Sequence, residues 1–430
     1  MDEATVSTPH MAWRVDADRL WQRLMALAAI GATPGGGVDR QALSKEEIAS
    51  WRLMIGWALS AGLEPSTDAV GNLFIALPGM DREAAPVLTG SHLDSQPGGG
   101  RFDGVYGVVA ALEVLTTCAE RGVRPPVDMV CVAWMNEEGS RFAPGMMGSE
   151  AFAGVRSLNA VRAARDADGI CVADALDALH AAFPALRQRP LGFAVHAYIE
   201  AHIEQGAVLE AQGCVIGVVT GIQGKKTFDV VIKGERGHAG TLAMADRRDA
   251  LEAFSRVATA LYREVGGYDA AVKFTIGQLQ VEPNAPSVVP ERVRLRIDLR
   301  HPDNTVLDLL GQRLNALCMA GAAPCTATVT PLVDAPSNGF DPTLQQAIVE
   351  ATERIGQTHM RILSAAGHDA RHLAPLCPSA MIFIPCRDGV SHAEHEWAEP
   401  AHVTAGANVL LQLLLPYFLA PRREPKHYPC

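Results

Sequence analysis

The sequence lacks the features that mark several large classes of protein. Its nine cysteines form no CxxC pair, and their spacing excludes a zinc finger. Several of them, such as Cys118, Cys131 and Cys318, lie within apolar runs, as reduced and buried thiols do. Low-complexity tracts and internal repeats are missing too. We therefore expect a globular, cytoplasmic protein.

Long apolar runs and an excess of positive charge are also missing. No apolar run approaches the roughly 20 residues that a membrane helix needs, and the polar, acidic start MDEATVSTPH is unlike a secretory signal. The formal net charge of -11 argues against nucleic acid or an anionic membrane as the main partner. What the chain does contain is 48% hydrophobic residues over 430 positions, enough for two or three domains with real cores.

Strands alternate with helices in the first part of the chain. Helical periodicity covers residues 16–28, 45–61 and 104–121, with Ser44 as the expected cap of the second helix. Short apolar runs at 71–77, 87–89 and 129–135 predict strands. This alternation is typical of an α/β fold with a mainly parallel sheet that is covered on both faces, in two or three layers.

The segment 217–332 follows a different pattern. Strands are expected at 227–233, 272–281, 292–300 and 325–329, with helices at 246–265 and 304–320. This β-α-β-β-α-β order is ferredoxin-like. The α/β pattern returns after residue 336. We therefore expect a discontinuous catalytic domain, residues 1–216 and 333–430, interrupted by an inserted lid-like domain at 217–332.

Polar residues follow two of the predicted strands. His92 and Asp94 come after the run 87–89, and Glu137 and Glu138 come after 129–135. The carboxyl ends of the strands are where such sheets place their active sites. Polar groups at the end of a buried strand are costly unless they are used, so we expect these residues to act together.

The residue types indicate a hydrolytic site with two metal ions. The candidate ligands are His92, Asp103, Glu138, His202 and His392. Asp103 is the expected bridge, and Asp94 would accept from the second ring nitrogen of His92. Because adjacent carboxylates cannot both point the same way, we assign Glu138 to metal and Glu137 to general base and then general acid. Each piece alone is weak, since a single histidine is more often a core residue and a Glu-Glu pair is usually solvated.

Several segments together resemble one family. They are Gly-Ser-His-Leu-Asp-Ser (90–95), Gly-Gly-Arg-Phe-Asp-Gly (99–104), Asn-Glu-Glu-Gly-Ser-Arg-Phe (136–142), His-Ile-Glu-Gln-Gly (202–206), Gly-His-Ala-Gly-Thr (237–241), Ala-Gly-His-Asp-Ala (366–370) and Asp-Gly-Val-Ser-His (388–392). On these residues the chain resembles the hydantoinase/carbamoylase branch of the M20 metallopeptidase-like amidohydrolases. That branch includes N-carbamoyl-L-amino acid hydrolases, β-ureidopropionases, and allantoate and ureidoglycolate amidohydrolases.

The resemblance implies a role for each matching residue. His92, Asp103 and His202 would hold one divalent ion, and Asp103, Glu138 and His392 the other, with Zn²⁺ or Mn²⁺ expected and Co²⁺ or Ni²⁺ also compatible. Glu137 would be the acid/base, and His392 is favoured over His395 as the ligand. The remaining residues that the resemblance assigns to substrate are Gln205, Arg300, Gly367, His368 and, from a neighbouring subunit, the lid histidine His238.

The match departs from the family pattern in the substrate-binding half. Ser287 stands where relatives usually carry Asn, and Ala243 replaces a usual Pro. The expected function is therefore hydrolysis of an N-carbamoyl (ureido) group on a small carboxylate by a homodimer, with an aminoacylase, dipeptidase or other amide hydrolase as the alternative. A catalytically silent binding protein with the same fold is a third interpretation, against which the full ligand set argues.

Overall fold

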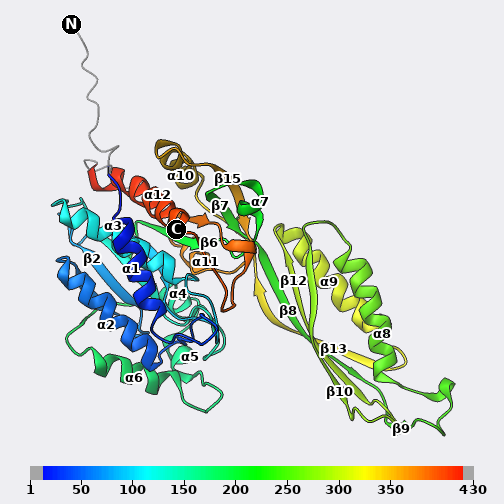
Figure 1. Ribbon diagram of the computed structural model, residues 1–430. Helices are drawn as coiled ribbons and strands as arrows, with labels where there is room; N and C mark the ends of the chain where they lie inside the picture. The colour runs from blue at the N-terminus through cyan, green and yellow to red at the C-terminus, as the bar shows by residue number, and fades with distance from the viewer. Residues whose placement is uncertain (1–12, 420–430) are drawn as a thin grey trace. The chain divides into compact units, whose positions relative to one another are not determined.

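The computed structural model describes residues 13–419, which form two compact units (Figure 1). The first unit runs to Thr220 and resumes at Gly339, and the second comprises Gly221–Asn338. The second unit occupies nearly the segment expected as an insertion, 217–332. That it acts as a lid stays a prediction. No helix in the described part of the chain is both long and apolar enough to cross a membrane.

The first unit combines ten helices with a ten-stranded sheet. Its helices are α1 (Ala17–Ala28), α2 (Lys45–Ser60), α3 (Val105–Glu120), α4 (Met147–Phe152), α5 (Leu158–Ala163), α6 (Val172–Ala182), α7 (Val208–Gln212), α10 (Pro342–Arg354), α11 (Ala370–Leu373) and α12 (Pro400–Leu419). Its strands are β1 (Glu64–Thr67), β2 (Leu73–Leu77), β3 (Val87–His92), β4 (Met129–Trp134), β5 (Arg187–Gln188), β6 (Ala197–Ile203), β7 (Ile216–Ile222), β14 (Asn338–Gly339), β15 (His359–Ser364) and β16 (Ser379–Ile384).

The centre of this sheet is parallel, as the alternation of helices and strands predicts. The strand order is β14-β7-β16-β6-β3-β4-β2-β1-β5, with β15 paired to β7. Strands β16, β6, β3 and β4 run parallel to one another, and the antiparallel strands β7 and β2 flank them. The mixed α/β class with a mainly parallel central sheet is thus confirmed.

The central strand β6 shows why both faces of the sheet are covered. All seven of its residues are buried. Ile199, Ala201 and Ile203 belong to the apolar core that includes α3, whereas Tyr198, Glu200 and His202 alternate with them and so face the opposite side. The polar face of this strand therefore places ionisable side chains, those of Glu200 and His202, in the interior of the unit.

Helix α2 shows how the sequence sets an element's start. The Ser44 Oγ accepts a hydrogen bond from the Glu47 backbone N–H at 3.2 Å, as the predicted cap requires. The Glu47 carboxylate accepts the N–H of Leu43, one residue before the cap. One N–H group that the helix leaves unpaired, that of Glu47, is satisfied in this way, and the Glu47 side chain ties the preceding turn to the helix.

The second unit is a four-stranded antiparallel sheet with two helices. Its elements are β8 (Gly224–Lys233), β9 (Gly237–His238), α8 (Ala250–Leu261), β10 (Lys273–Glu282), β11 (Val288–Val289), β12 (Arg292–His301), α9 (Asn304–Gly321) and β13 (Thr326–Ala335). The sheet order is β10-β12-β8-β13, and β9 pairs with β11 in a separate ladder. Helices α8 and α9 pack together on one face of the sheet (Figure 1).

Strand β12 separates the two faces of this sheet. Val293, Leu295, Ile297 and Leu299 are buried against the helices, and the residues between them are more exposed. The alternation expected at 292–300 is present. At the end of the sheet where the unit joins the rest of the chain, β8 and β13 are antiparallel neighbours, with Lys225 opposite Ala335. In the first unit, β7 and β14 are likewise neighbours.

Candidate metal centre

The four parallel strands of the first unit bring the predicted ligands to one edge. His92 is the last residue of β3, and His202 is the last but one of β6. Glu137 and Glu138 follow β4, and the loop after β16 carries His392. Since parallel strands end at the same edge, these segments converge there. The expected strand 87–89 is longer than predicted, which places His92 inside it.

The first group of potential ligands is His92, Asp103 and His202. Their donor atoms lie within 4.8 Å of one another, and all three side chains are buried. The Asp103 Oδ1 is 3.3 Å from the His202 Nε2 and 3.9 Å from the His92 Nε2. The residues that the sequence assigned to one ion are therefore brought together.

Both of these histidines turn an unprotonated nitrogen toward the group. The His92 Nδ1 lies 3.0 Å from the Asp94 carbonyl oxygen, and the His202 Nδ1 lies 2.9 Å from the Ile203 carbonyl oxygen. A carbonyl can only accept, so Nδ1 carries the proton in each ring. The Nε2 lone pair of each ring then points toward the group, as in metal-binding histidines, and that of His202 accepts the Gly104 N–H at 3.3 Å.

The second group is Asp103, Glu138 and His392. The other Asp103 oxygen, Oδ2, accepts from the His392 Nε2 at 3.0 Å, and the Glu138 Oε2 is 3.5 Å from the same nitrogen. Asp103 thus turns one oxygen toward each group, as a bridging carboxylate would. The His392 side chain is 48% exposed, so the centre opens to solvent on this side.

Glu137 lies beside the first group but is not one of its three potential ligands. Its Oε2 is 3.6 Å from the His92 Nε2, and its side chain is buried. Burial, and then the nearby carboxylates of Asp369 and Glu138, raise the pKa of Glu137 well above its ordinary value. A buried carboxylate with a raised pKa beside the ligands suits a group that takes and returns a proton.

Asp94 differs from its predicted role. The His92 Nδ1 hydrogen-bonds to the backbone oxygen of Asp94, and the Asp94 carboxylate Oδ1 is farther away, at 3.6 Å. The carboxylate instead accepts the backbone N–H groups of Glu137 and Glu138, each at 3.2 Å. The sharp turn after β4 offers these two N–H groups, and Asp94 therefore orients the carboxylate pair more than the imidazole.

Gln96 and Gly104 also shape the centre, and the sequence reasoning missed both. The Gln96 side chain donates to the Glu138 Oε2 at 2.9 Å, and its backbone N–H donates to Oε1 at 3.2 Å. Gly104 has φ +65, and a Cβ there would lie 2.3 Å from the His92 ring. Gly104 ends one of the segments on which the family resemblance rests, and Gln96 directly follows another, which was the available signal.

The charge balance of the centre fits bound cations. Burial, and then the negative charge of the neighbouring Asp103, raise the pKa of Glu138 to about 8. For Asp103 burial acts in the same direction, but the hydrogen bond from His392 and the electrostatic influence of the imidazoles of His202 and His92 bring its pKa below the ordinary value. Crowded carboxylates with only imidazoles to balance them, and no thiolate, form a donor set for Zn²⁺, Mn²⁺, Co²⁺ or Ni²⁺.

Three residues predicted to hold substrate lie near these ligands in the first unit. The Gln205 Nε2 donates to the Asp103 Oδ2 at 2.9 Å, and its buried Oε1 has no hydrogen-bond partner among the described residues. The His368 ring meets the His202 ring edge-on at 4.5 Å, and its Nε2 is 2.9 Å from the Ser364 Oγ. A Cβ on Gly367 would lie 2.5 Å from the Met146 side chain.

The other predicted substrate residues belong to the second unit. His238 is exposed in β9, and the exposed Ser287 directly precedes β11. The Ala239 N–H donates to the Ser287 carbonyl at 3.0 Å. Arg300 is in β12 and donates to the Asp298 carboxylate at 2.8 Å. Their contact with a substrate stays a prediction.

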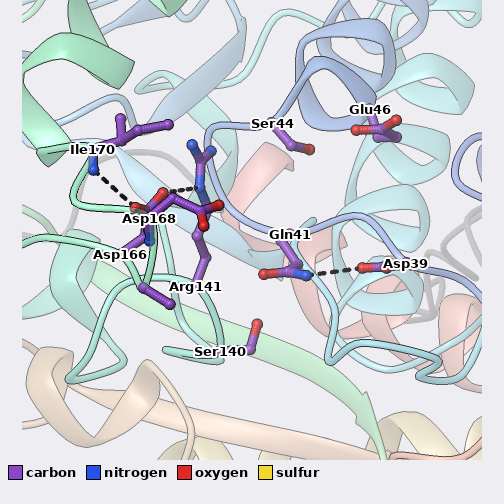
Figure 2. A pocket seen from close by; sticks show the side chains of 10 residues that line it. Asp39, Gln41, Ser44, Glu46, Ser140, Arg141, Asp166, Asp168 and Ile170 are labelled. Atoms are coloured by element: carbon purple, nitrogen blue, oxygen red, sulfur yellow. Dashed lines mark hydrogen bonds and ion pairs between the residues drawn. The ribbon is translucent and has the colours of Figure 1, made fainter.

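A separate pocket of about 360 Å³ lies next to the segment that follows Glu138 (Figure 2). Ser140 and Arg141 line it, together with several carboxylates. Figure 2 shows the Arg141 guanidinium directed at Asp166, 3.1 Å away. Arg141 also donates to the Ala42 carbonyl at 2.9 Å. These contacts fasten the segment after Glu138, and no predicted ligand lines this pocket.

Comparisons with known proteins agree with this arrangement. The family described as peptidase family M20/M25/M40 matches residues 88–415. The chain is 37% identical to an N-carbamoyl-L-amino-acid amidohydrolase of Rhizobium meliloti over 94% of this chain and 96% of that protein. It is 33% identical to the allantoate amidohydrolase of Bacillus subtilis, covering 90% and 94%. A crystal structure of a hydantoinase/carbamoylase family amidase from Burkholderia multivorans superposes with a TM-score of 0.86 at 42% identity, covering 95% and 99%.

Proposed function

This chain belongs to peptidase family M20/M25/M40, and from that membership we propose that it hydrolyses a C–N bond in the ureido group of a small carboxylate. An N-carbamoyl-L-amino acid is the proposed type of substrate. The similarity to N-carbamoyl-amino acid and allantoate amidohydrolases supports ureido chemistry. We further propose two divalent ions per subunit.

One observation carries the proposal. The two oxygens of Asp103 face two groups of ligand atoms, one with His92 and His202 and the other with Glu138 and His392. The unligated Glu137 is at the same place, 3.6 Å from the His92 Nε2. A shared carboxylate beside a free one is the arrangement that hydrolysis with two ions needs.

The chain's own residues then perform the proton transfers. Bound divalent ions would supply Lewis acidity, which lowers the pKa of water and polarises the ureido carbonyl. Glu137 accepts the proton of the attacking water and returns it to the leaving nitrogen. The C–N bond to that nitrogen breaks and leaves a carbamic acid. Loss of carbon dioxide from the carbamic acid breaks the second C–N bond, so the final products are ammonia, carbon dioxide and an amine.

The second unit is proposed to recognise the substrate and to form the subunit contact. Arg300 would bind the substrate carboxylate through two N–H groups, and His238 would stabilise the developing oxyanion across a homodimer. Gln205, Ser287, Gly367 and His368 are the other proposed substrate contacts. We propose that this unit is a ferredoxin-like lid. The outer strands β10 and β13 offer an edge for the partner, and Leu332 in β13 is 49% exposed.

A cytoplasmic location fits the thiol chemistry. The eight cysteines of the described residues are free, and burial raises the pKa of Cys118 and Cys318 to about 12. Thiols of this kind persist in a reducing compartment.

The test is a hydrolysis screen with the metal-reconstituted protein. N-carbamoyl-L-amino acids, allantoate and ureidoglycolate form the first set and are assayed for released ammonia. N-acyl amino acids and dipeptides form the second set and are assayed for newly freed amino groups, because their hydrolysis releases no ammonia. We expect turnover in the first set only. Turnover confined to the second set would establish the aminoacylase or dipeptidase alternative. Absence of bound metal, with no rescue by Zn²⁺, Mn²⁺, Co²⁺ or Ni²⁺, would overturn the hydrolytic proposal.

A further inference from the structure

We propose that Glu396 is a positioning residue that fixes the segment carrying His392 to the segment carrying Asp103. The inference rests on the proposed metal centre, although Glu396 touches none of the proposed ligand side chains through its own carboxylate. It acts through backbone N–H groups and one hydroxyl, and we assign to it the geometry of the Asp103, Glu138 and His392 group.

The contacts of the Glu396 carboxylate join two distant parts of the chain. Its Oε1 accepts the backbone N–H groups of Phe102 and Asp103, at 2.9 and 3.1 Å. Its Oε2 accepts the Ser391 hydroxyl at 3.0 Å. One carboxylate thus holds the turn before α3 to the residue that precedes His392. Charge-assisted bonds of this kind are stronger than neutral ones.

The surroundings are shaped for this carboxylate. Glu396 is 1% exposed, and a Cβ on Gly100 would lie 1.9 Å from its carboxyl group. Only a glycine at position 100 therefore lets the carboxylate approach the backbone of 102 and 103. A buried carboxylate costs free energy unless hydrogen bonds satisfy it, and three donors do so here.

The two groups of ligands depend on this clamp unequally. His92 and His202 lie in strands β3 and β6, whose ladders fix their backbone. His392 lies in a loop, has φ +54 and is 48% exposed on its side chain. The residue before it, Ser391, is tied to Glu396. Asp103 belongs to both groups, but the first group keeps His92 and His202 in strand ladders. Loss of the clamp should therefore weaken mainly the group that contains His392.

Three variants separate a positioning role from a general structural one. Glu396→Ala removes all three bonds. Glu396→Gln keeps an oxygen for the two N–H groups and offers an N–H to the Ser391 oxygen, so the clamp stays while the charge is lost. Asp128→Ala is the matched control. Asp128 is 5% exposed, accepts the Gly79 N–H at 2.8 Å, and precedes β4 at the end of that strand opposite Glu137.

The experiment is a Co²⁺ titration of the full chain, followed by its absorption spectrum and by ion content after dialysis. We expect the wild type, Glu396→Gln and Asp128→Ala to bind two ions. Glu396→Ala should keep one and bind the second about 10–100-fold more weakly, as loss of a partner behind the ligands typically causes. Thermal unfolding of the four proteins without metal measures the stability lost by each variant.

Each other outcome contradicts a defined part of the inference. Two ions bound with unchanged affinity by Glu396→Ala would overturn it, and so would a weakening in Glu396→Gln equal to that in Glu396→Ala, which would indicate charge alone. If Glu396→Ala does not fold, Ser391→Ala decides. It removes the hydroxyl that contacts both the Glu396 Oε2 and the Asp103 Oδ2, at 3.0 and 3.3 Å, and should weaken only the second ion. Failure of the wild type to bind Co²⁺ would refute the proposed metal centre itself.

Discussion

The proposed ligands of the first unit and the proposed substrate residues of the second are built differently. His92, Asp103, Glu138 and His202 have side chains at most 5% exposed, and neighbouring residues hold them in place, whereas the fifth proposed ligand, His392, is 48% exposed in a loop. The Arg300 side chain, by contrast, is 30% exposed on the open face of a sheet. Metal binding needs fixed distances, so its residues are constrained before any ligand arrives. Substrate recognition on an exposed sheet face tolerates more change, and we expect variation between relatives to concentrate there.

Replacing the free carboxylate should produce the largest effect. Glu137→Gln keeps the shape of the side chain but cannot accept a proton from water. We expect turnover to fall about 10³-fold, equal to about 4 kcal/mol of barrier. Steady-state ammonia release measures this loss, and Co²⁺ content should stay at the wild-type value. Substantial activity in this variant would refute the mechanism, whereas loss of Co²⁺ would show that Glu137 is itself a ligand.

Metal removal should lower the stability of the first unit and leave that of the second unit unchanged. A ligand at 100 times its dissociation constant stabilises the folded state by about 2.7 kcal/mol. Chelation should therefore lower the protection of amides in β3 and β6 and leave those in β12 unchanged. Hydrogen exchange with and without a chelator measures both. An equal loss of protection in β12 would contradict the idea that only the first unit is built around the ions.

The smallest expected effect tests the exposed face of the second unit. Arg300→Ala should raise KM for a carboxylate substrate about tenfold or more, because a hydrogen bond to a charged group contributes about 1.5–3 kcal/mol. Arg296→Ala is the matched control, since Arg296 lies on the same face of β12, 3.7 Å from Asp229. Its KM should change less than about twofold, in keeping with exposed ion pairs. Equal effects of the two variants would assign Arg300 to the general surface.

Elements with a clear period could be predicted from the sequence. The strand expected at 292–300 is β12, Arg292–His301, because one face is buried and the other is not. The helix expected at 104–121 is α3, Val105–Glu120. Strand β6 was missed because Glu200 and His202 interrupt its apolar run. Helices α4 and α5 were missed because six residues carry too little periodicity.

The site divides in the same manner. That the proposed ligand residues lie together could be predicted because His, Asp and Glu at strand ends are rare without a use. The residues that hold them could not, because Gln96, Ser391 and Glu396 act through contacts between segments that lie far apart in the chain. The contact of His92 with the backbone oxygen of Asp94, in place of its carboxylate, could not be predicted either, because a backbone group leaves no mark in the pattern of side chains.

The pairing of β8 with β13 has a consequence for how the chain folds. Because Lys225 lies opposite Ala335, the second unit brings its own two ends together once it has formed. The entropic cost of closing this long loop is then offset by the contacts within that unit. Once the unit has folded, the flanking strands β7 and β14 can pair as if a short loop connected them. The length of the insertion can therefore change over evolutionary time with little effect on the assembly of the sheet that carries the ligands.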